Sequence, residues 1–136
     1  LGKKKKLCYN LIEIERDEKM PKITIKVTLI TPELTDEKTY NAIYHPEENS
    51  IIYKEEDKTT TKVSLNEKRL RRENEELLME YLFAEEKNTK GRVTIKSLNK
   101  TLELNLKATK INQVDKNIEI NYVLENDEYK YKLEVI

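Results

Sequence analysis

Apolar and polar residues alternate over much of this chain, and this alternation restricts the possible folds more than any other feature of the sequence. The clearest run begins at Lys22, where apolar residues at 23, 25, 27 and 29 alternate with polar ones. Successive side chains of a β-strand point to opposite faces, so a period of two predicts a strand with one apolar face. Similar short runs occupy 40–44, 51–55 and 59–65 and are separated by polar loops.

The segment 64–86 fits two different structures. Most of its residues favour helices, and Ser64 and Glu67 have the spacing of a capping box. Residues 77–83 nevertheless alternate with period two, and Asn74 is suited to a turn. We predict two strands joined at Asn74, with at most a short helical turn near Glu67, because the neighbouring segments have strand periodicity.

Two hairpins are predicted near the carboxyl end. After a turn at 88–91, a two-residue loop at Asn99 and Lys100 would join the strands of the first hairpin. A four-residue loop at 125–128 would join those of the second. In both, the apolar side chains then share one face. The predicted pairs are Val93 with Leu106, Ile95 with Leu104, Tyr122 with Tyr131, Ile120 with Leu133, and Ile118 with Val135.

Many short strands with short connections predict an all-β antiparallel meander. An open sheet would expose its edge strands, so we expect closure into a barrel of about eight to ten strands. Residues 20–136 would form this single barrel domain. Residues 1–19 would form a basic tail with a possible edge strand, because a lysine run precedes a short alternating segment.

Composition argues against several classes of function. The chain has 26 basic and 26 acidic residues, so its net charge does not favour nucleic acid. Cys8 and His45 are the only cysteine and histidine, and there are 2 glycines, which disfavours a metal site, a nucleophilic catalyst and a phosphate-binding loop. We therefore expect no enzymatic activity, no cofactor and no catalytic residue. The absence of a long apolar run and of cysteine pairs predicts a cytoplasmic protein that does not enter membranes.

Several short motifs follow one another along the chain: IIYKEE with Tyr53 and Glu55, TTTKVSL with Thr59 to Leu65, LRREN with Leu70 and Arg72, MEYLF with Met79 and Glu80, LELNL at 102–106 and IEINY at 118–122. In this order they resemble the motifs of the YwiB-like bacterial proteins of unknown function, which have a calycin-like (lipocalin-like) β-barrel. Two positions depart from the family pattern: Asn74 replaces a glycine, and the aromatic–glycine pair before LELNL is replaced around 98–100. The chain has no tryptophan, so the lipocalin Gly-x-Trp signature is missing. The resemblance implies a fold and no particular activity.

Polar residues on apolar faces indicate a candidate site. Glu55 shares a face with Tyr53, and Arg72 shares a face with Leu70, so an ion pair could form inside the barrel. This pair could hold a polar ligand group, or it could close one end of the barrel as a structural contact. Seven tyrosines also fall on apolar faces: Tyr40, Tyr44, Tyr53, Tyr81, Tyr122, Tyr129 and Tyr131. The candidate ligand-binding residues are Tyr53, Glu55, Thr61, Arg72, Tyr122 and Tyr131.

Two functions are compatible with these features. The barrel could bind a small hydrophobic or amphipathic molecule in its interior, or side chains could fill it and its outer surface could bind another protein. Both faces of 77–83 are apolar, so Leu78 and Leu82 could form an outer patch that supports a homodimer. A cavity lined by Tyr, Glu and Arg would favour the first function, and a filled barrel with an apolar outer patch would favour the second.

Overall fold

The computed structural model describes residues 21–136, which form ten β-strands in one closed antiparallel barrel. The predicted tail and edge strand of residues 1–19 and Cys8 lie outside this range. A short 3₁₀ turn, η1 (Lys96–Leu98), lies between β7 and β8. The strands are β1 (Lys22–Ile30), β2 (Thr35–His45), β3 (Ser50–Lys54), β4 (Thr60–Ser64), β5 (Arg69–Glu73), β6 (Leu77–Leu82), β7 (Asn88–Ile95), β8 (Lys100–Val114), β9 (Asn117–Leu124) and β10 (Asp127–Val135).

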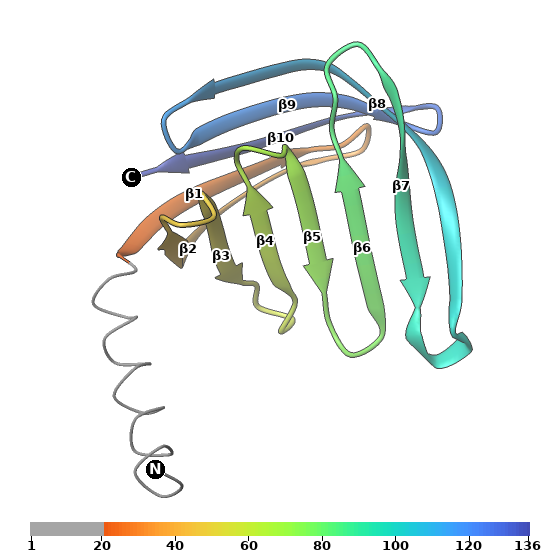
Figure 1. Ribbon diagram of the computed structural model, residues 1–136, viewed down its shortest axis with the longest axis horizontal. Helices are drawn as coiled ribbons and strands as arrows, with labels where there is room; N and C mark the ends of the chain where they lie inside the picture. The colour runs from red at the N-terminus through yellow and green to blue at the C-terminus, as the bar shows by residue number, and fades with distance from the viewer. Residues whose placement is uncertain (1–20) are drawn as a thin grey trace, which may run out of the picture.

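The topology is the simplest that closes a barrel. Each strand pairs with the next along the chain, and β1 completes the ring by pairing with β10, as in the pair Val27 and Leu133. Figure 1 shows β1, β9 and β10 crossing above β3 to β6 at a steep angle. Closure leaves no unpaired sheet edge. The predicted all-β antiparallel barrel is therefore confirmed. Among residues 21–136 there is no helix of the length and hydropathy that crossing a membrane requires.

The ambiguous segment 64–86 forms strands β5 and β6. Asn74 ends β5, and its side-chain Oδ1 accepts hydrogen bonds from the backbone N–H groups of Glu76 and Leu77, at 2.8 and 2.9 Å. This side-chain turn ends one strand and starts the next. The residues around Glu67 form a turn in which Lys68 has a φ of 58°. The two predicted strands are confirmed, and no helical turn occurs at Glu67.

The predicted turn at 88–91 is wrong, because β7 already begins at Asn88. The loop of the following hairpin is also longer than predicted and contains η1. As a result Val93 pairs with Leu102 and Gly91 with Leu104, so the register differs from the prediction by four residues. A shift by an even number leaves every side chain on its predicted face.

The register of the last hairpin also differs from the prediction. Asp127 pairs with Leu124, so the loop contains only Glu125 and Asn126. Glu125 adopts a φ of 55°, which allows this tight connection. Tyr122 therefore pairs with Tyr129, two positions from the predicted Tyr131. The apolar face is again preserved, because the shift is even.

A β-bulge in β8 reverses its inward face. Ala108 pairs with Tyr122 and Lys110 with Asn121, which leaves Thr109 as an extra residue. Before the bulge the even-numbered residues point inward. After it the odd-numbered Ile111 points inward, because it pairs with Ile120 and packs against the core. A bulge bends its strand and increases its twist, which helps a 15-residue strand to curve around the barrel.

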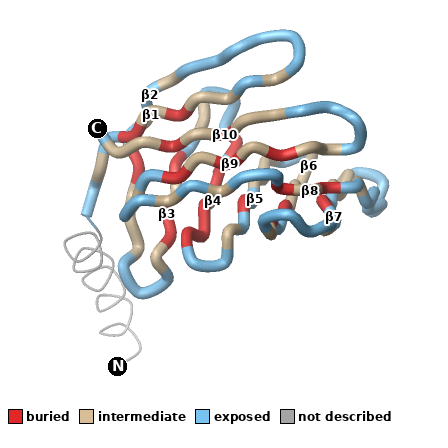
Figure 2. The backbone as a smooth tube through the Cα atoms, turned by 90° about the horizontal axis from the view of Figure 1, so that it is seen from above, coloured by how far each residue is buried: buried red, intermediate tan, exposed pale blue. Residues whose placement is uncertain are grey.

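One end of the barrel is filled. It is the end at which β1 begins and β10 ends, and its largest side chains are fully buried. Figure 2 shows buried positions along the strands and exposed hairpin loops. Tyr44 also lies near this end, where its hydroxyl donates a 2.7 Å hydrogen bond to Asn49 Oδ1. Aliphatic side chains thus close this end. They include Ile25, Ile51, Leu65, Ile118, Ile120 and Leu133.

Candidate functional site

A cavity of about 230 Å³ lies in the opposite half of the barrel, toward the β1–β2, β3–β4, β5–β6 and β9–β10 loops. Its wall combines phenol rings, aliphatic side chains and four charged groups. The barrel is therefore filled at one end and hollow toward the other. The lining residues are Val27, Leu29, Asp36, Lys38, Tyr40, Tyr53, Glu55, Leu70, Arg72, Met79, Tyr81, Tyr122, Leu124, Tyr129 and Tyr131.

The strand register brings the polar residues of the cavity together. Tyr53 pairs with Thr61, Thr61 with Arg72, and Arg72 with Met79, so one inward row crosses β3, β4, β5 and β6. Directly paired residues on one face have neighbouring side chains. Glu55 follows the end of β3, two positions beyond Tyr53. Its side chain therefore lies next to this row, on the side of the β3–β4 loop.

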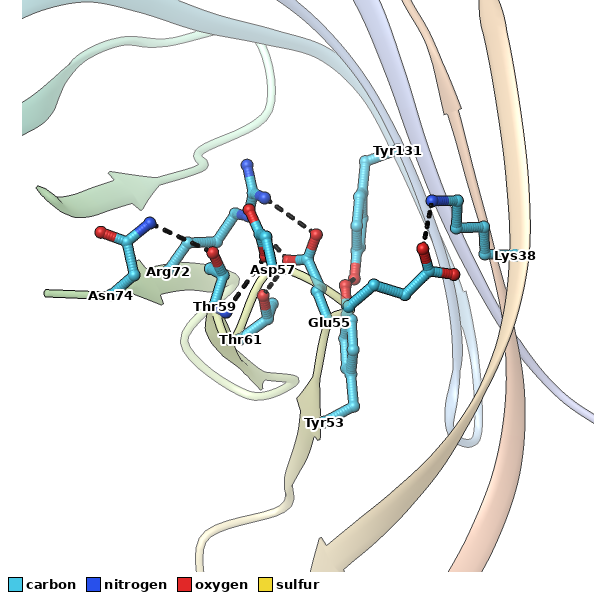
Figure 3. A network of polar contacts seen from close by, with 10 residues as sticks. Lys38, Tyr53, Glu55, Asp57, Thr59, Thr61, Arg72, Asn74 and Tyr131 are labelled. Carbon is cyan, nitrogen blue, oxygen red and sulfur yellow. Dashed lines mark hydrogen bonds and ion pairs between the residues drawn. The ribbon is translucent and has the colours of Figure 1, made fainter. Parts of the chain in front are cut away.

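Glu55 and Arg72 form a two-point ion pair at the cavity wall (Figure 3). Arg72 Nε donates to Glu55 Oε2 at 3.0 Å, and Nη2 donates to Oε1 at 2.9 Å. The side chains are 31% and 19% exposed for Arg72 and Glu55. Burial alone would lower the pKa of Arg72, but its hydrogen bonds to Glu55 and the attraction between the charges raise it. The predicted ion pair is thus present.

Other polar groups support this pair. The fully buried Thr61 hydroxyl donates to Glu55 Oε2 at 2.6 Å. Beside it, Asn74 Nδ2 donates to Thr59 Oγ1 at 3.2 Å, and the Thr59 backbone N–H donates to Asp57 Oδ1 at 3.1 Å. These bonds connect the β3–β4 loop to the β5–β6 turn (Figure 3). The network therefore fixes Glu55 and Arg72 at this side of the cavity.

Six of the seven predicted inward tyrosines line the cavity, and Tyr44 is the exception. The hydroxyls of Tyr53 and Tyr131 lie 2.9 Å apart and share a hydrogen bond. Burial raises the pKa of both phenols, as it does for Tyr122. All three are therefore neutral hydrogen-bonding groups at pH 7.

The phenol rings also pack against one another around the cavity. The rings of Tyr40 and Tyr53 stack at 4.9 Å between centroids, and those of Tyr122 and Tyr129 at 5.3 Å. Tyr81 meets Tyr122 edge to face at 6.3 Å. Within residues 21–136, the hydroxyls of Tyr81 and Tyr122 have no hydrogen-bond partner, and both residues line the cavity. The wall thus offers apolar ring faces together with unused polar groups.

Gly91 makes room for Tyr81. The two residues pair across β6 and β7, and a Cβ atom at Gly91 would lie 2.9 Å from two carbons of the Tyr81 ring. That distance is shorter than ordinary contacts, so any side chain would displace the ring. The glycine therefore allows the phenol to lie across the β7 backbone.

Charged residues from β2 contribute to the cavity as well. Lys38 makes an ion pair of 3.4 Å with Glu56 of the β3–β4 loop, and Asp36 lies two positions earlier on the same face. Glu56, and to a lesser extent Asp36, raise the pKa of Lys38. The sequence analysis missed both cavity-lining residues. Asp36 and Lys38 alternate with Tyr40, so the period-two pattern contained the signal.

The structure brings the six predicted site residues together. Tyr53, Glu55, Arg72, Tyr122 and Tyr131 line the cavity, and Thr61 lies behind Glu55. Whether they bind a ligand stays a prediction. In the part of the chain that the structure describes, no group of three or more His, Cys, Asp or Glu residues is placed to hold a metal ion.

The predicted outer face of β6 is partly exposed. Leu82 is 40% exposed, and Leu78 lies half-buried on the same face. Both alternate with the inward-facing Met79 and Tyr81, as predicted.

A scan against protein-family models finds no match, and a search of curated proteins also finds none. A search of solved structures finds similarity to the "Crystal structure of ywiB protein from Bacillus subtilis", with a TM-score of 0.62. The similar region covers 89% of this chain and 98% of that chain, at 18% sequence identity. At this identity the similarity concerns the fold alone. The chain thus shares its barrel fold with the YwiB structure, which confirms the predicted YwiB-like resemblance at the level of the fold.

Proposed function

We propose that this protein is a non-enzymatic binder of a small amphipathic or hydrophobic molecule, held in the barrel cavity. The observation that carries the proposal is the asymmetry of the interior. Aliphatic side chains fill one end, whereas a 230 Å³ space lined by six tyrosines and an ion pair occupies the other. An apolar wall with a few convergent polar groups is typical of ligand sites.

The volume indicates a small ligand. Cavities of about 150 Å³ in protein cores can hold benzene. The cavity of about 230 Å³ therefore suits one ring with a short substituent. Ring faces such as those of Tyr122 and Tyr129 favour an aromatic or flat apolar body.

The site is better suited to binding than to catalysis. Burial keeps the phenols of Tyr53, Tyr122 and Tyr131 neutral, so none is an activated nucleophile or base. Glu55 already accepts three hydrogen bonds from Arg72 and Thr61. We also expect the protein to act in the cytoplasm, because a single cysteine suits a reducing compartment.

Filling the cavity tests the proposal. Met79 lines the cavity, whereas Glu80, its neighbour on β6, points to the outer face. We expect NMR titrations of the full chain to show saturable binding of toluene by the wild type and by Glu80→Trp. Met79→Trp should lose this binding, because the larger ring occupies the space. An absence of saturable binding by the wild type, or unchanged binding by a folded Met79→Trp variant, would contradict the proposal.

A second candidate function is a protein interaction through the outer face of β6. The exposure of Leu82, at 40%, next to Leu78 favours it. Under this alternative the barrel is a structural module that forms a homodimer or binds another protein. Sedimentation of wild type and Leu82→Lys would test it. A wild-type dimer that dissociates in the variant supports the alternative, and a monomer at high concentration contradicts the homodimer.

A further inference from the structure

Arg72 has hydrogen-bonding capacity that its ion pair does not use. A guanidinium group has five N–H donors, and Glu55 accepts from two of its nitrogens, Nε and Nη2. No other acceptor for Arg72 occurs within residues 21–136. Figure 3 shows the third nitrogen, Nη1, turned away from the carboxylate. Arg72 is also one of the residues that line the cavity.

Glu55, by contrast, is well supplied with donors. Its Oε2 accepts from Arg72 Nε and from Thr61, and its Oε1 accepts from Arg72 Nη2. Tyr81 and Tyr122 line the same cavity as Arg72. These phenol hydroxyls lack partners within the described residues. Guanidinium N–H groups can only donate and phenol hydroxyls can also donate, so a hydrogen-bond acceptor fits this part of the cavity.

Charge determines which acceptor fits. Glu55 already balances Arg72, and Asp57 adds a second negative charge that raises the pKa of Arg72. A bound anion would therefore place an uncompensated negative charge in the cavity. An ammonium group would meet the positive guanidinium edge. An uncharged oxygen acceptor avoids both costs.

We propose that the cavity selects uncharged single-ring compounds that carry a carbonyl oxygen, and that this oxygen accepts hydrogen bonds from the free edge of Arg72. The ring would then lie against the nearby apolar wall, which includes Leu70, Met79 and Tyr122. This inference rests on the proposed binding function and specifies the chemical class of its ligand.

Four probes of one ring each test the charge and acceptor requirements. Acetophenone carries the carbonyl, and α-methylstyrene has the same shape with a methylene in place of the oxygen. Benzoate and benzylamine carry a negative and a positive charge. We expect calorimetric or NMR titrations to show acetophenone binding about tenfold more tightly than the other three, because hydrogen bonds to charged groups are among the stronger ones. Equal affinity for α-methylstyrene, or tighter binding of benzoate or benzylamine, would overturn the inference.

An Arg72→Lys variant tests the assigned residue. Lysine keeps a positive charge beside Glu55 but lacks the planar edge of arginine. Arg71→Lys is the matched control, because Arg71 lies next in sequence and points outward. We expect Arg72→Lys to lower the affinity for acetophenone to that for α-methylstyrene, and Arg71→Lys to leave both unchanged. A preserved carbonyl preference in folded Arg72→Lys would refute the role of Arg72.

The outcomes separate this inference from the proposed function. If no probe binds the wild type, both fail. If α-methylstyrene binds but acetophenone has no advantage, the cavity binds small molecules and only the carbonyl inference fails. If Arg72→Lys does not fold, the comparison of the four probes on the wild type decides.

Discussion

The Glu55–Arg72 pair should contribute measurably to stability, and a double-mutant cycle can determine the amount. Removing one partner from a fully buried pair costs about 3–5 kcal/mol, whereas exposed pairs contribute about 0–1 kcal/mol. Here the side chains are 19% and 31% exposed, so solvent screens the pair in part. We therefore expect Glu55→Ala and Arg72→Ala each to lower the free energy of unfolding by about 2 kcal/mol.

The two effects should not add. Either substitution breaks both hydrogen bonds between the pair, so the double variant should lose about 1–2 kcal/mol less than the sum of the single losses. Glu55→Ala also leaves the buried Thr61 hydroxyl without its acceptor, which makes this variant the more informative single change.

Urea unfolding of the four proteins, followed by circular dichroism, measures the cycle. The control is the outward pair Arg92 and Glu103, whose charged atoms lie 3.6 Å apart and whose side chains are 62% and 55% exposed. Its coupling should stay below about 0.5 kcal/mol. Additive losses for Glu55 and Arg72, within about 0.3–0.5 kcal/mol, would refute the reasoning.

Three further changes should alter stability in defined directions. Gly91→Ala should destabilise the fold by about 1–3 kcal/mol in urea unfolding, because the new Cβ displaces the Tyr81 ring; an unchanged midpoint would contradict this. Lys58→Gly should raise the melting temperature slightly and Lys58→Val should lower it, because Lys58 has a φ of 67°; the opposite order would count against a left-handed turn there. Buried Tyr53 and Tyr131 should not change stability between about pH 7 and 10, and above about pH 10 stability should fall, because the unfolded chain releases phenol protons that these buried residues retain. Unfolding free energies that do not decline at alkaline pH would contradict the burial of these phenols.

The sequence predicted the faces of the strands better than their register. Side-chain alternation identifies which residues point inward, and both predicted hairpins kept these faces. A shift of two or four residues leaves the alternation unchanged, so it could not distinguish Tyr122 opposite Tyr131 from Tyr122 opposite Tyr129. The loop length would have determined the register. It could not be predicted, because residues such as Glu125 adopt left-handed turn conformations that are not expected from their residue type.

The candidate site was predictable where alternation alone determines direction. The inward placement of Glu55 and Arg72 follows from their neighbours, and their ion pair follows from the cost of isolated buried charges. Two features depend on long-range packing. Gly91 was assigned to a turn because the sequence does not show the Tyr81 ring above it. The bulge at Thr109 was missed because a single extra residue leaves no compositional signal.

Native mass spectrometry of protein isolated from its own host tests the central claim, that the cavity binds a small molecule, most directly. We expect the wild type to retain a ligand whose mass corresponds to about one ring with a short substituent, in keeping with the cavity of about 230 Å³. Met79→Trp, purified in the same way, should lose this mass, and Glu80→Trp should keep it. A ligand-free wild-type protein, or a bound mass that persists in Met79→Trp, would contradict the account.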